Sequence, residues 1–568
     1  MELTKLSLSI CQRTLSLDTN KWYQSANTEK ENKLKHFDFI IVGGGSAGCV
    51  LAARLSECAN FSVLLIEAGG EDTSPLIKMP AGAVSMVPTH YNNWAFDTAP
   101  QQAMANRIGY QPRGKVLGGS SAINAMIYIR GHQQDYQDWA HLGWGWDDVL
   151  PYFIKSENNQ NLYNDSNSKD LHGHNGPLYV SNSYSNHPIA DAFVDAGVAL
   201  GYPHIDDFNG FEQEGMGRYQ VTQYKGQRFS ASRSYLEPIR YRKNLTVITN
   251  TEVAKVILED KVCKGIETLD GKTYTAEKEV LLSAGAIKSP QILLLSGVGP
   301  KEQLANNNIK LQHELDGVGQ NLQDHPDYVS CFESNRTDLY GLSASAIPKM
   351  IKQAYQYFKN EQGILTSNFA ETGGFLKTDK ALQRPDIQFH FVIATVKDHA
   401  RDWRTSLKHG FSNHTCVLRP KSVGSVTLKS NNPTDCPIID PNFLAHEDDV
   451  NTMLAGVKMA NQILQHDLIK RYQVCSINQD QNLDDNELID KIKTLTDSVY
   501  HPIGTCKMGL LDDPSAVVNN QLEVIGIENL RVVDASVFPN LIGGNTNAPT
   551  IMVAERCADM IKEKWLNN

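Results

Sequence analysis

Three glycines and one acidic residue give the first chemical signal of the chain. Gly43, Gly45 and Gly48 follow a short apolar run, and Glu67 comes later at the end of a second one. The first glycine permits a tight turn, the second lets backbone approach a pyrophosphate, and the third lets a helix pack closely on a strand. An acid roughly 20 residues further on is placed to bind ribose hydroxyls. This spacing predicts a dinucleotide site and leaves NAD and FAD open.

A second group of polar residues lies near the C-terminus. His501 stands directly before a proline, so its backbone is expected to be extended. A strand-like run ends in Asp534, and the polar loop 543–550 leads into an alanine-rich helix. Taken alone, His501 is more typical of a hydrogen-bonded structural histidine than of a catalytic one.

The elements that must position the glycines follow from the apolar pattern. Phe37–Val42 and Phe61–Ile66 are short apolar runs, as expected of parallel strands buried on both faces, and a helical pattern over Cys49–Glu57 joins them. Residues 245–258 alternate as a strand pair would, and residues 280–282 resemble another buried strand. Together they predict a strand–turn–helix–strand unit inside a larger sheet.

Residues 326–500 change in character, with longer polar connections and expected strands at 365–375 and 387–391. Residues 340–358 place apolar side chains at helical spacing beside several lysines. Such a pattern usually marks a surface helix whose apolar face packs on the core. A membrane-contacting amphipathic segment and the wall of an apolar substrate channel are the alternatives.

Composition restricts the partners and the compartment. The chain has 53 Lys+Arg and 64 Asp+Glu, a net charge of −11, which argues against nucleic acid as a partner. No window reaches the roughly 18 apolar residues of a spanning helix. The ten cysteines are scattered without a C-x-x-C pair, so no metal cluster is expected. We therefore expect a cytoplasmic protein, and a peripheral contact with the inner face of the cytoplasmic membrane stays open. Oligomeric state is not predicted.

From about Phe37 to Ile561 the chain resembles the glucose–methanol–choline (GMC) family of FAD-dependent oxidoreductases. The segments that carry the resemblance are VGGGSAG, GKVLGGSSAINAM, GAIKSPQILLLSGVG, VGQNLQDHP, HPIGTCKMG and GGNTNAPTIM. Within the family, the chain is most similar to bacterial aliphatic alcohol dehydrogenases of alkane oxidation and slightly less similar to choline dehydrogenases.

The resemblance implies an α/β, Rossmann-like FAD-binding domain that is discontinuous in sequence, with an α+β substrate domain built on an antiparallel sheet. The implied boundaries are a polar N-terminal extension at 1–35, FAD-binding segments at 36–158, 225–325 and 500–568, the last with the catalytic loop, and substrate-domain segments at 159–224 and 326–499.

The resemblance also implies the site. His501 matches the catalytic histidine, and Asn547 is matched to the second active-site position. Some relatives attach FAD covalently through a histidine at the position of Ile123, so non-covalent FAD is expected. The implied FAD contacts are Gly43, Gly45, Ser46, Ala47, Gly48, Glu67, Trp94, Gly119, Asn124, Ala125, Met126, Ile127, Val253, Asp534, Ala535, Ala548, Pro549 and Thr550.

The implied reaction is oxidation of a primary alcohol, aliphatic and of medium chain length, to the aldehyde. Hydride passes to flavin N5, His501 acts as general base, Asn547 holds the oxygen, and a quinone or other acceptor takes the electrons. Choline dehydrogenase is the main alternative. A lyase or a fatty-acid photodecarboxylase is a weaker one, because Leu418 stands where the latter carries a cysteine before Arg419-Pro420. An NAD-dependent dehydrogenase would leave the loop around His501 unexplained.

Overall fold

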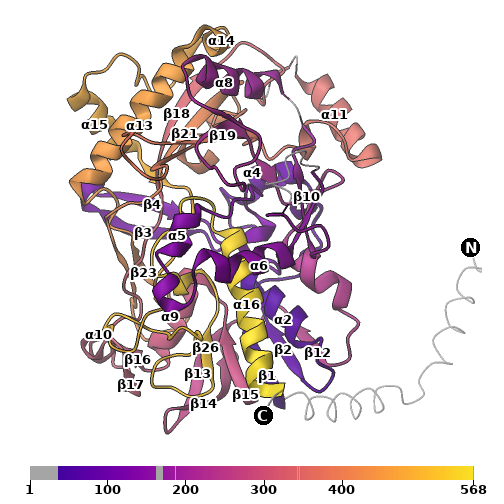
Figure 1. Ribbon diagram of the computed structural model, residues 1–568, viewed down its shortest axis with the longest axis vertical. Coiled ribbons are helices and arrows are strands. Elements are labelled where there is room, and N and C mark those ends of the chain that lie inside the picture. The colour runs from indigo at the N-terminus through magenta and orange to yellow at the C-terminus, as the bar shows by residue number, and fades with distance from the viewer. Residues whose placement is uncertain (1–35, 162–169, 186, 342, 345, 567–568) are drawn as a thin grey trace, which may run out of the picture.

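The computed structural model describes residues 36–161, 170–185, 187–341, 343–344 and 346–566 (Figure 1). The N-terminal extension predicted at 1–35 lies outside these residues. Two large sheets organise the described chain, one toward each end of the long axis in Figure 1.

The first sheet contains the strands predicted around the glycine motif. Strands β12, β2, β1 and β15 are parallel, with β12 at one edge of the sheet, and β26 pairs in parallel with the last residues of β15. An antiparallel hairpin, β14 and β13, extends the sheet beside the first part of β15. The bounds are β1 His36–Val42, β2 Val63–Ile66, β12 Leu245–Ile248, β13 Val253–Glu259, β14 Val262–Thr268, β15 Thr273–Leu282 and β26 Leu530–Val532.

Helices from distant parts of the sequence cover this sheet. Helix α16 (Asn547–Leu566) packs against α2 (Ser46–Leu55) and α6 (Trp146–Ser156), and α9 (Gly285–Leu295) packs against β13. Figure 1 shows α16, at the C-terminal end of the chain, beside α2 and the first strands. The last segment of the chain therefore completes the domain that the first segment begins.

The second sheet is built from antiparallel strands except at its β7 edge, where β7 and β8 run parallel. Helices α8 (Pro188–Ala199) and α13 (Glu447–Gln465) contact each other and pack on this sheet. The bounds are β7 His204–Ile205, β8 Gly215–Arg218, β18 Pro326–Glu333, β19 Thr372–Leu376, β20 Ile387–Val392, β21 Gly410–Val417, β24 Cys475–Ser476 and β25 Asp497–Ser498.

The predicted fold class, a discontinuous α/β domain with an α+β domain on an antiparallel sheet, is confirmed. The expected strand pair at 245–258 is wrong in one respect. Both strands form, but β12 and β13 lie at opposite edges of the first sheet, because β2, β1, β15 and β14 come between them. The proposed domain boundaries stay a prediction.

Residues 347–360 form the predicted amphipathic helix, α11 (Ile347–Asn360), at the periphery of the molecule in Figure 1. Its expected packing on the core is wrong: Tyr357 is its buried residue, whereas Ile351 and Phe358 are 66% and 72% exposed. None of the described helices has the length and apolar character needed to cross a membrane.

Candidate active site

A cavity of about 400 Å³ lies between the two sheets. On one side it meets the residues that follow the parallel strands: Gly43 after β1, Glu67 after β2, Ser283 after β15 and Asp534 after β26. Parallel strands end at the same edge of a sheet, and ligands bind in the crevice there. On the other side, His390 and Val392 of β20 point into the cavity, while the alternate residues of that strand pack in the core.

Each glycine of the motif has a separate structural reason. Gly43 has a φ of +101°, and a Cβ there would lie 2.5 Å from the Ser283 oxygen. A Cβ on Gly48 would lie 1.9 Å from the Gly43 oxygen, so Gly48 permits close packing of helix on strand. The nearest described atom to a Cβ on Gly45 would be the Ser283 oxygen at 3.9 Å, so this glycine leaves open space at the cavity wall. No side chain in the described part of the chain caps the start of α2, whose first N–H groups can therefore receive an anion.

Glu67 is held at the adjoining strand end. Its two carboxylate oxygens accept hydrogen bonds from the backbone N–H groups of Gly44 and Gly69, each at 2.8 Å. Burial raises the pKa of Glu67 to about 7 against the lowering effect of these bonds. The carboxyl group is thus fixed beside the glycine turn and within the cavity lining, where a ribose would follow the pyrophosphate.

Most of the predicted cofactor contacts line this cavity, and three do not. Gly48 lies behind the turn, for the packing reason given above. Ala548 and Pro549 lie in the first turn of α16, where Asn547 and Thr550 share the face toward the cavity and Ala548 turns into the core, so their contact with FAD stays a prediction. The predicted residues that do line it are Gly43, Gly45, Ser46, Ala47, Glu67, Trp94, Gly119, Asn124, Ala125, Met126, Ile127, Val253, Asp534, Ala535 and Thr550, with His501 and Asn547.

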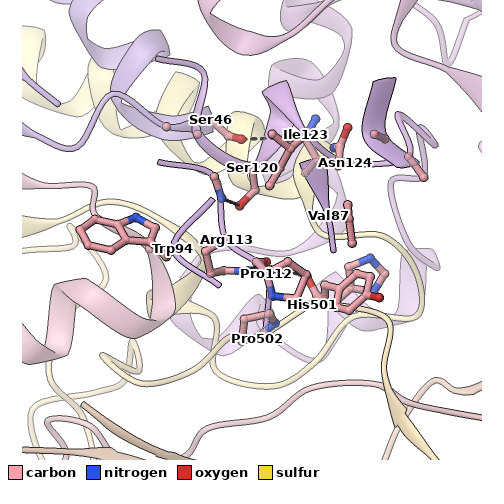
Figure 2. A pocket seen from close by; sticks show the side chains of 18 of the residues that line it. Ser46, Val87, Trp94, Pro112, Arg113, Ser120, Ile123, Asn124, His501 and Pro502 are labelled. Carbon is pink, nitrogen blue, oxygen red and sulfur yellow. Dashed lines mark hydrogen bonds between the residues drawn. The ribbon is translucent and has the colours of Figure 1, made fainter. Parts of the chain in front are cut away.

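The residues present fit FAD. An open anion-binding turn, an acid at the next strand end, and a long cavity that continues to His501 match a dinucleotide with a flavin at its far end. Residues 283–288 also line the cavity, and sequence reasoning did not assign them to the site, although their density of small side chains was a signal. Arg113 was missed as well; Figure 2 shows it between Trp94 and His501.

His501 is anchored through its backbone. Its N–H donates to Asp324 Oδ1 at 2.7 Å, and the same oxygen accepts from the His325 N–H at 2.8 Å. The other Asp324 oxygen accepts from Gln111 Nε2 at 2.8 Å and from Ser498 Oγ at 2.5 Å. Asp324 therefore holds Gln111, the residue before β18, and residues of and just after β25 at one point, which fixes the position of the His501 backbone.

The tautomer of His501 follows from its neighbour His325. The Nε2 atom of His325 lies 3.1 Å from two carbonyl oxygens, those of Leu418 and Ile542, so Nε2 must carry hydrogen and donate. His325 Nδ1 is then an acceptor, and it lies 2.9 Å from His501 Nδ1. His501 must therefore hold its hydrogen on Nδ1, which leaves an unprotonated Nε2.

His501 is set up as a neutral base. Burial lowers its pKa well below the ordinary value, and the positions of His325, His390 and Arg113 add to the effect. Burial also lowers the pKa of His325 to about 3, so both rings stay neutral at physiological pH. The unprotonated Nε2 of His501 can accept a proton throughout that range.

The structure corrects the predicted pairing of His501 with Asn547. Asn547 Oδ1 accepts a hydrogen bond from Ser46 Oγ at 2.7 Å. The amide that meets His501 is that of Asn545, whose Nδ2 lies 3.1 Å from Nε2. Gln388 Nε2 donates to Asn545 Oδ1 at 3.3 Å and so fixes the orientation of this amide. Both asparagines line the cavity, but the turn before α16 brings Asn545, not Asn547, to His501.

Comparison with known sequences agrees with this site. Models of the family described as GMC oxidoreductase match residues 37–327 and 420–554. An alcohol dehydrogenase [acceptor] of Pseudomonas putida is 44% identical over 538 residues, 93% of this chain and 96% of that protein. Mitochondrial choline dehydrogenase of Mus musculus is 40% identical over 544 residues, 93% of this chain and 89% of that protein.

Solved structures share the fold. A formate oxidase superposes with a TM-score of 0.86 at 29% identity, covering 94% of this chain and 99% of its own. Pyridoxine 4-oxidase from Mesorbium loti gives a TM-score of 0.82 at 29% identity, with the same coverage of both chains. Together with the cofactor cradle (the glycine turn 43–48 and Glu67) and the site around His501, these matches show that the chain belongs to the GMC oxidoreductase family of FAD enzymes.

Proposed function

We propose that this protein is an FAD-dependent dehydrogenase that oxidises primary, medium-chain aliphatic alcohols to aldehydes. The observation that carries the proposal is the apolar character of the cavity half that the second sheet and residues 84–88 build around His501. Among the described lining residues the carboxylates are Glu67, Glu252 and Asp534, and all three come from the nucleotide-binding half. The apolar lining comprises Val84, Val87, Pro88, Phe369, Ala370, Val392, Ala394, Val396 and Ala400, and the uncharged or histidine side chains of Asn368, His390, Thr395, His399, Ser406 and His414 line the same half.

Two side chains of the site act on the alcohol, His501 on its proton and Asn545 on its oxygen. His501 accepts the hydroxyl proton at Nε2, and its Nδ1–H keeps the bond to His325 while positive charge develops on the ring. Asn545 Nδ2 donates to the alcohol oxygen in place of its present contact with His501, and Gln388 holds that amide in position. When bound, FAD supplies the hydride acceptor.

Choline is the alternative substrate, and the 40% identity to choline dehydrogenase is in its favour. Tyr340 and Phe369 both line the cavity with ring centroids 4.8 Å apart, so aromatic faces are available to a quaternary ammonium. No described carboxylate lies in this half of the cavity to balance the charge. The aliphatic alcohol therefore fits the lining better.

The role of His501 is tested with His501→Ala. A general base contributes about 10²- to 10⁴-fold, so this variant should keep bound FAD and lose at least about two orders of magnitude in the rate of anaerobic flavin reduction by 1-octanol. His414→Ala is the matched control, because His414 also lines the cavity but pairs with Asp327 at 2.6 Å. Near-normal flavin reduction in His501→Ala would refute the assignment.

We also propose that FAD is held without a covalent bond. Ile123, at the position where some relatives attach FAD through a histidine, is buried and lines the cavity without a nucleophilic atom (Figure 2). Acid precipitation should release all of the flavin into the supernatant. Yellow colour that stays with the precipitated protein would contradict this.

A quinone is the proposed electron acceptor, and α11 supports a peripheral contact with a membrane that contains it. Five apolar residues and three lysines of α11 are exposed, an arrangement suited to an anionic lipid surface. The helix packs against residues 364–366, just before the cavity-lining Asn368 and Phe369, so it lies near the cavity wall. The apolar residues are Ile347, Met350, Ile351, Tyr355 and Phe358, and the lysines are Lys349, Lys352 and Lys359.

Vesicle flotation tests this contact. The native protein should float with vesicles that contain phosphatidylglycerol, and the double variant Ile351→Ser, Phe358→Ser should stay in the dense fraction with its octanol activity toward a soluble dye intact. Tyr241→Ser, at a site 83% exposed on the other domain, is the control and should float as the native protein does. If the double variant floats as well as the native protein, α11 is not the membrane-contacting helix.

A further inference from the structure

Arg228 is a buried cation that has no acidic partner among the residues that the structure describes. It lies in β11 (Gln227–Arg228) and is 1% exposed. Its guanidinium donates to the carbonyl oxygens of Ile77 and Ser121, at 3.0 Å and 3.3 Å, and to Asn124 Oδ1 at 2.8 Å. Its NH2 atom has no hydrogen-bond partner among the described residues. Burial of an uncompensated cation is costly, so this arrangement calls for a reason.

The nearby acids do not neutralise Arg228. A small cavity of about 140 Å³ beside the guanidinium is lined by three acidic residues together with Lys78, Arg233 and Arg240, and burial lowers the pKa of Arg228 to about 9. The acids have other partners: Glu71 lies 2.7 Å from Arg240, Glu237 lies 4.0 Å from Arg233, and Asp72 hydrogen-bonds to Ser232.

The contact with Asn124 connects Arg228 to the cofactor cavity. Asn124 lines that cavity, and its Oδ1 accepts a second bond from the Met126 N–H at 3.0 Å. Two donors on Oδ1 fix the amide orientation, and Nδ2 makes no hydrogen bond to another described residue. The amide N–H groups of Asn124 are therefore left for the group that occupies the cavity, and Figure 2 places Asn124 beside Ile123 at its wall.

We propose that Arg228 is a positioning residue for FAD that orients the Asn124 amide and places an uncompensated positive charge behind it, thereby favouring the reduced cofactor. Reduction adds negative charge to a flavin, and a cation in a buried environment stabilises that charge more than one in water. The proposal rests on FAD binding and is independent of which alcohol is the substrate.

The midpoint potential of the bound flavin tests the proposal. Arg228→Gln keeps hydrogen-bond donors and removes the charge, whereas Arg228→Lys keeps the charge. Arg228→Gln should change the ratio of oxidised to reduced flavin at a fixed potential at least tenfold toward the oxidised form, about 30 mV for a two-electron couple. Arg228→Lys should recover most of this shift. Arg240→Met, beside the same small cavity but paired with Glu71, should leave the ratio within about twofold.

A second readout separates the two roles. If Arg228→Gln leaves the Asn124 amide unoriented, FAD should bind more weakly to this variant in titrations followed by flavin fluorescence. This effect is independent of the rate of alcohol oxidation. An oxidised-to-reduced ratio in Arg228→Gln within twofold of the native protein would overturn the proposal. If Arg228→Gln does not fold, Arg228→Lys decides: a tenfold shift in this charge-conserving variant would overturn it, and a native ratio would support it.

Discussion

Replacement of His325 tests the tautomer argument at the centre of the site. His325→Leu removes the acceptor for His501 Nδ1–H, which lies 2.9 Å away in a fully buried position. An unsatisfied buried donor costs about 1–3 kcal/mol. The cost falls on the reactive tautomer of His501, which carries its hydrogen on Nδ1. The other tautomer carries it on Nε2, where the N–H can point into the open cavity. At 1.36 kcal/mol per tenfold, the rate of flavin reduction should fall about 5- to 150-fold.

The matched variant is His325→Asn, whose amide oxygen can stand near the position of Nδ1 and accept the same hydrogen. Its rate should stay within about threefold of the native rate. Both rates are measured by anaerobic stopped flow at saturating 1-octanol, after FAD content is shown to be equal. Nitrogen-15 NMR of histidine-labelled protein reports the His501 tautomer directly. Equal rates in the two variants would refute the reasoning.

Three further predictions concern separate parts of the structure. Gly45→Val fills the open space at the glycine turn, so FAD affinity measured by fluorescence should fall at least about tenfold, while the apoprotein should keep its melting temperature. Asn545→Leu should slow flavin reduction about 10- to 100-fold, and Asn547→Leu should slow it less, because only Asn545 meets His501; the reverse order would contradict the corrected assignment. Hydrogen bonds to Asp207 and Glu157 raise the pKa of His172 although burial opposes them, so its stabilising effect should be full below pH about 6.5 and lost as pH rises through the folded-state pKa. Urea unfolding of His172→Gln should therefore differ from the native protein more at pH 6 than at pH 9, and a pH-independent difference would argue against this.

The cofactor cradle could be predicted from sequence because its requirements are local. Each glycine meets a need set within a few residues: the turn at Gly43, the open wall at Gly45 and the helix contact at Gly48. Glu67 could be predicted for the same reason. It directly follows β2, which runs parallel to β1, so it lies at the same edge of the sheet as the glycine turn. These backbone requirements depend on neighbouring residues and not on contacts with distant parts of the chain.

The parts that could not be predicted depend on long-range contacts. Asn545 and Asn547 are two residues apart in a polar loop, and only Ser46 and Gln388, far away in sequence, decide which amide meets His501. Strands β12 and β13 are neighbours in the sequence and lie at opposite edges of the sheet, because two earlier strands, β1 and β2, and two later ones, β14 and β15, lie between them. The periodicity of α11 identified its apolar face, but nothing in that periodicity states whether protein covers it.

The rates at which 1-octanol and choline, tested separately, reduce the bound flavin under anaerobic conditions test the central claim most directly. Native protein with bound FAD is mixed with 1-octanol or with choline at equal concentration, and the loss of visible flavin absorbance is followed. The apolar half-cavity around a neutral His501 predicts rapid bleaching with 1-octanol and much slower bleaching with choline. No bleaching with 1-octanol, or faster bleaching with choline, would contradict the account.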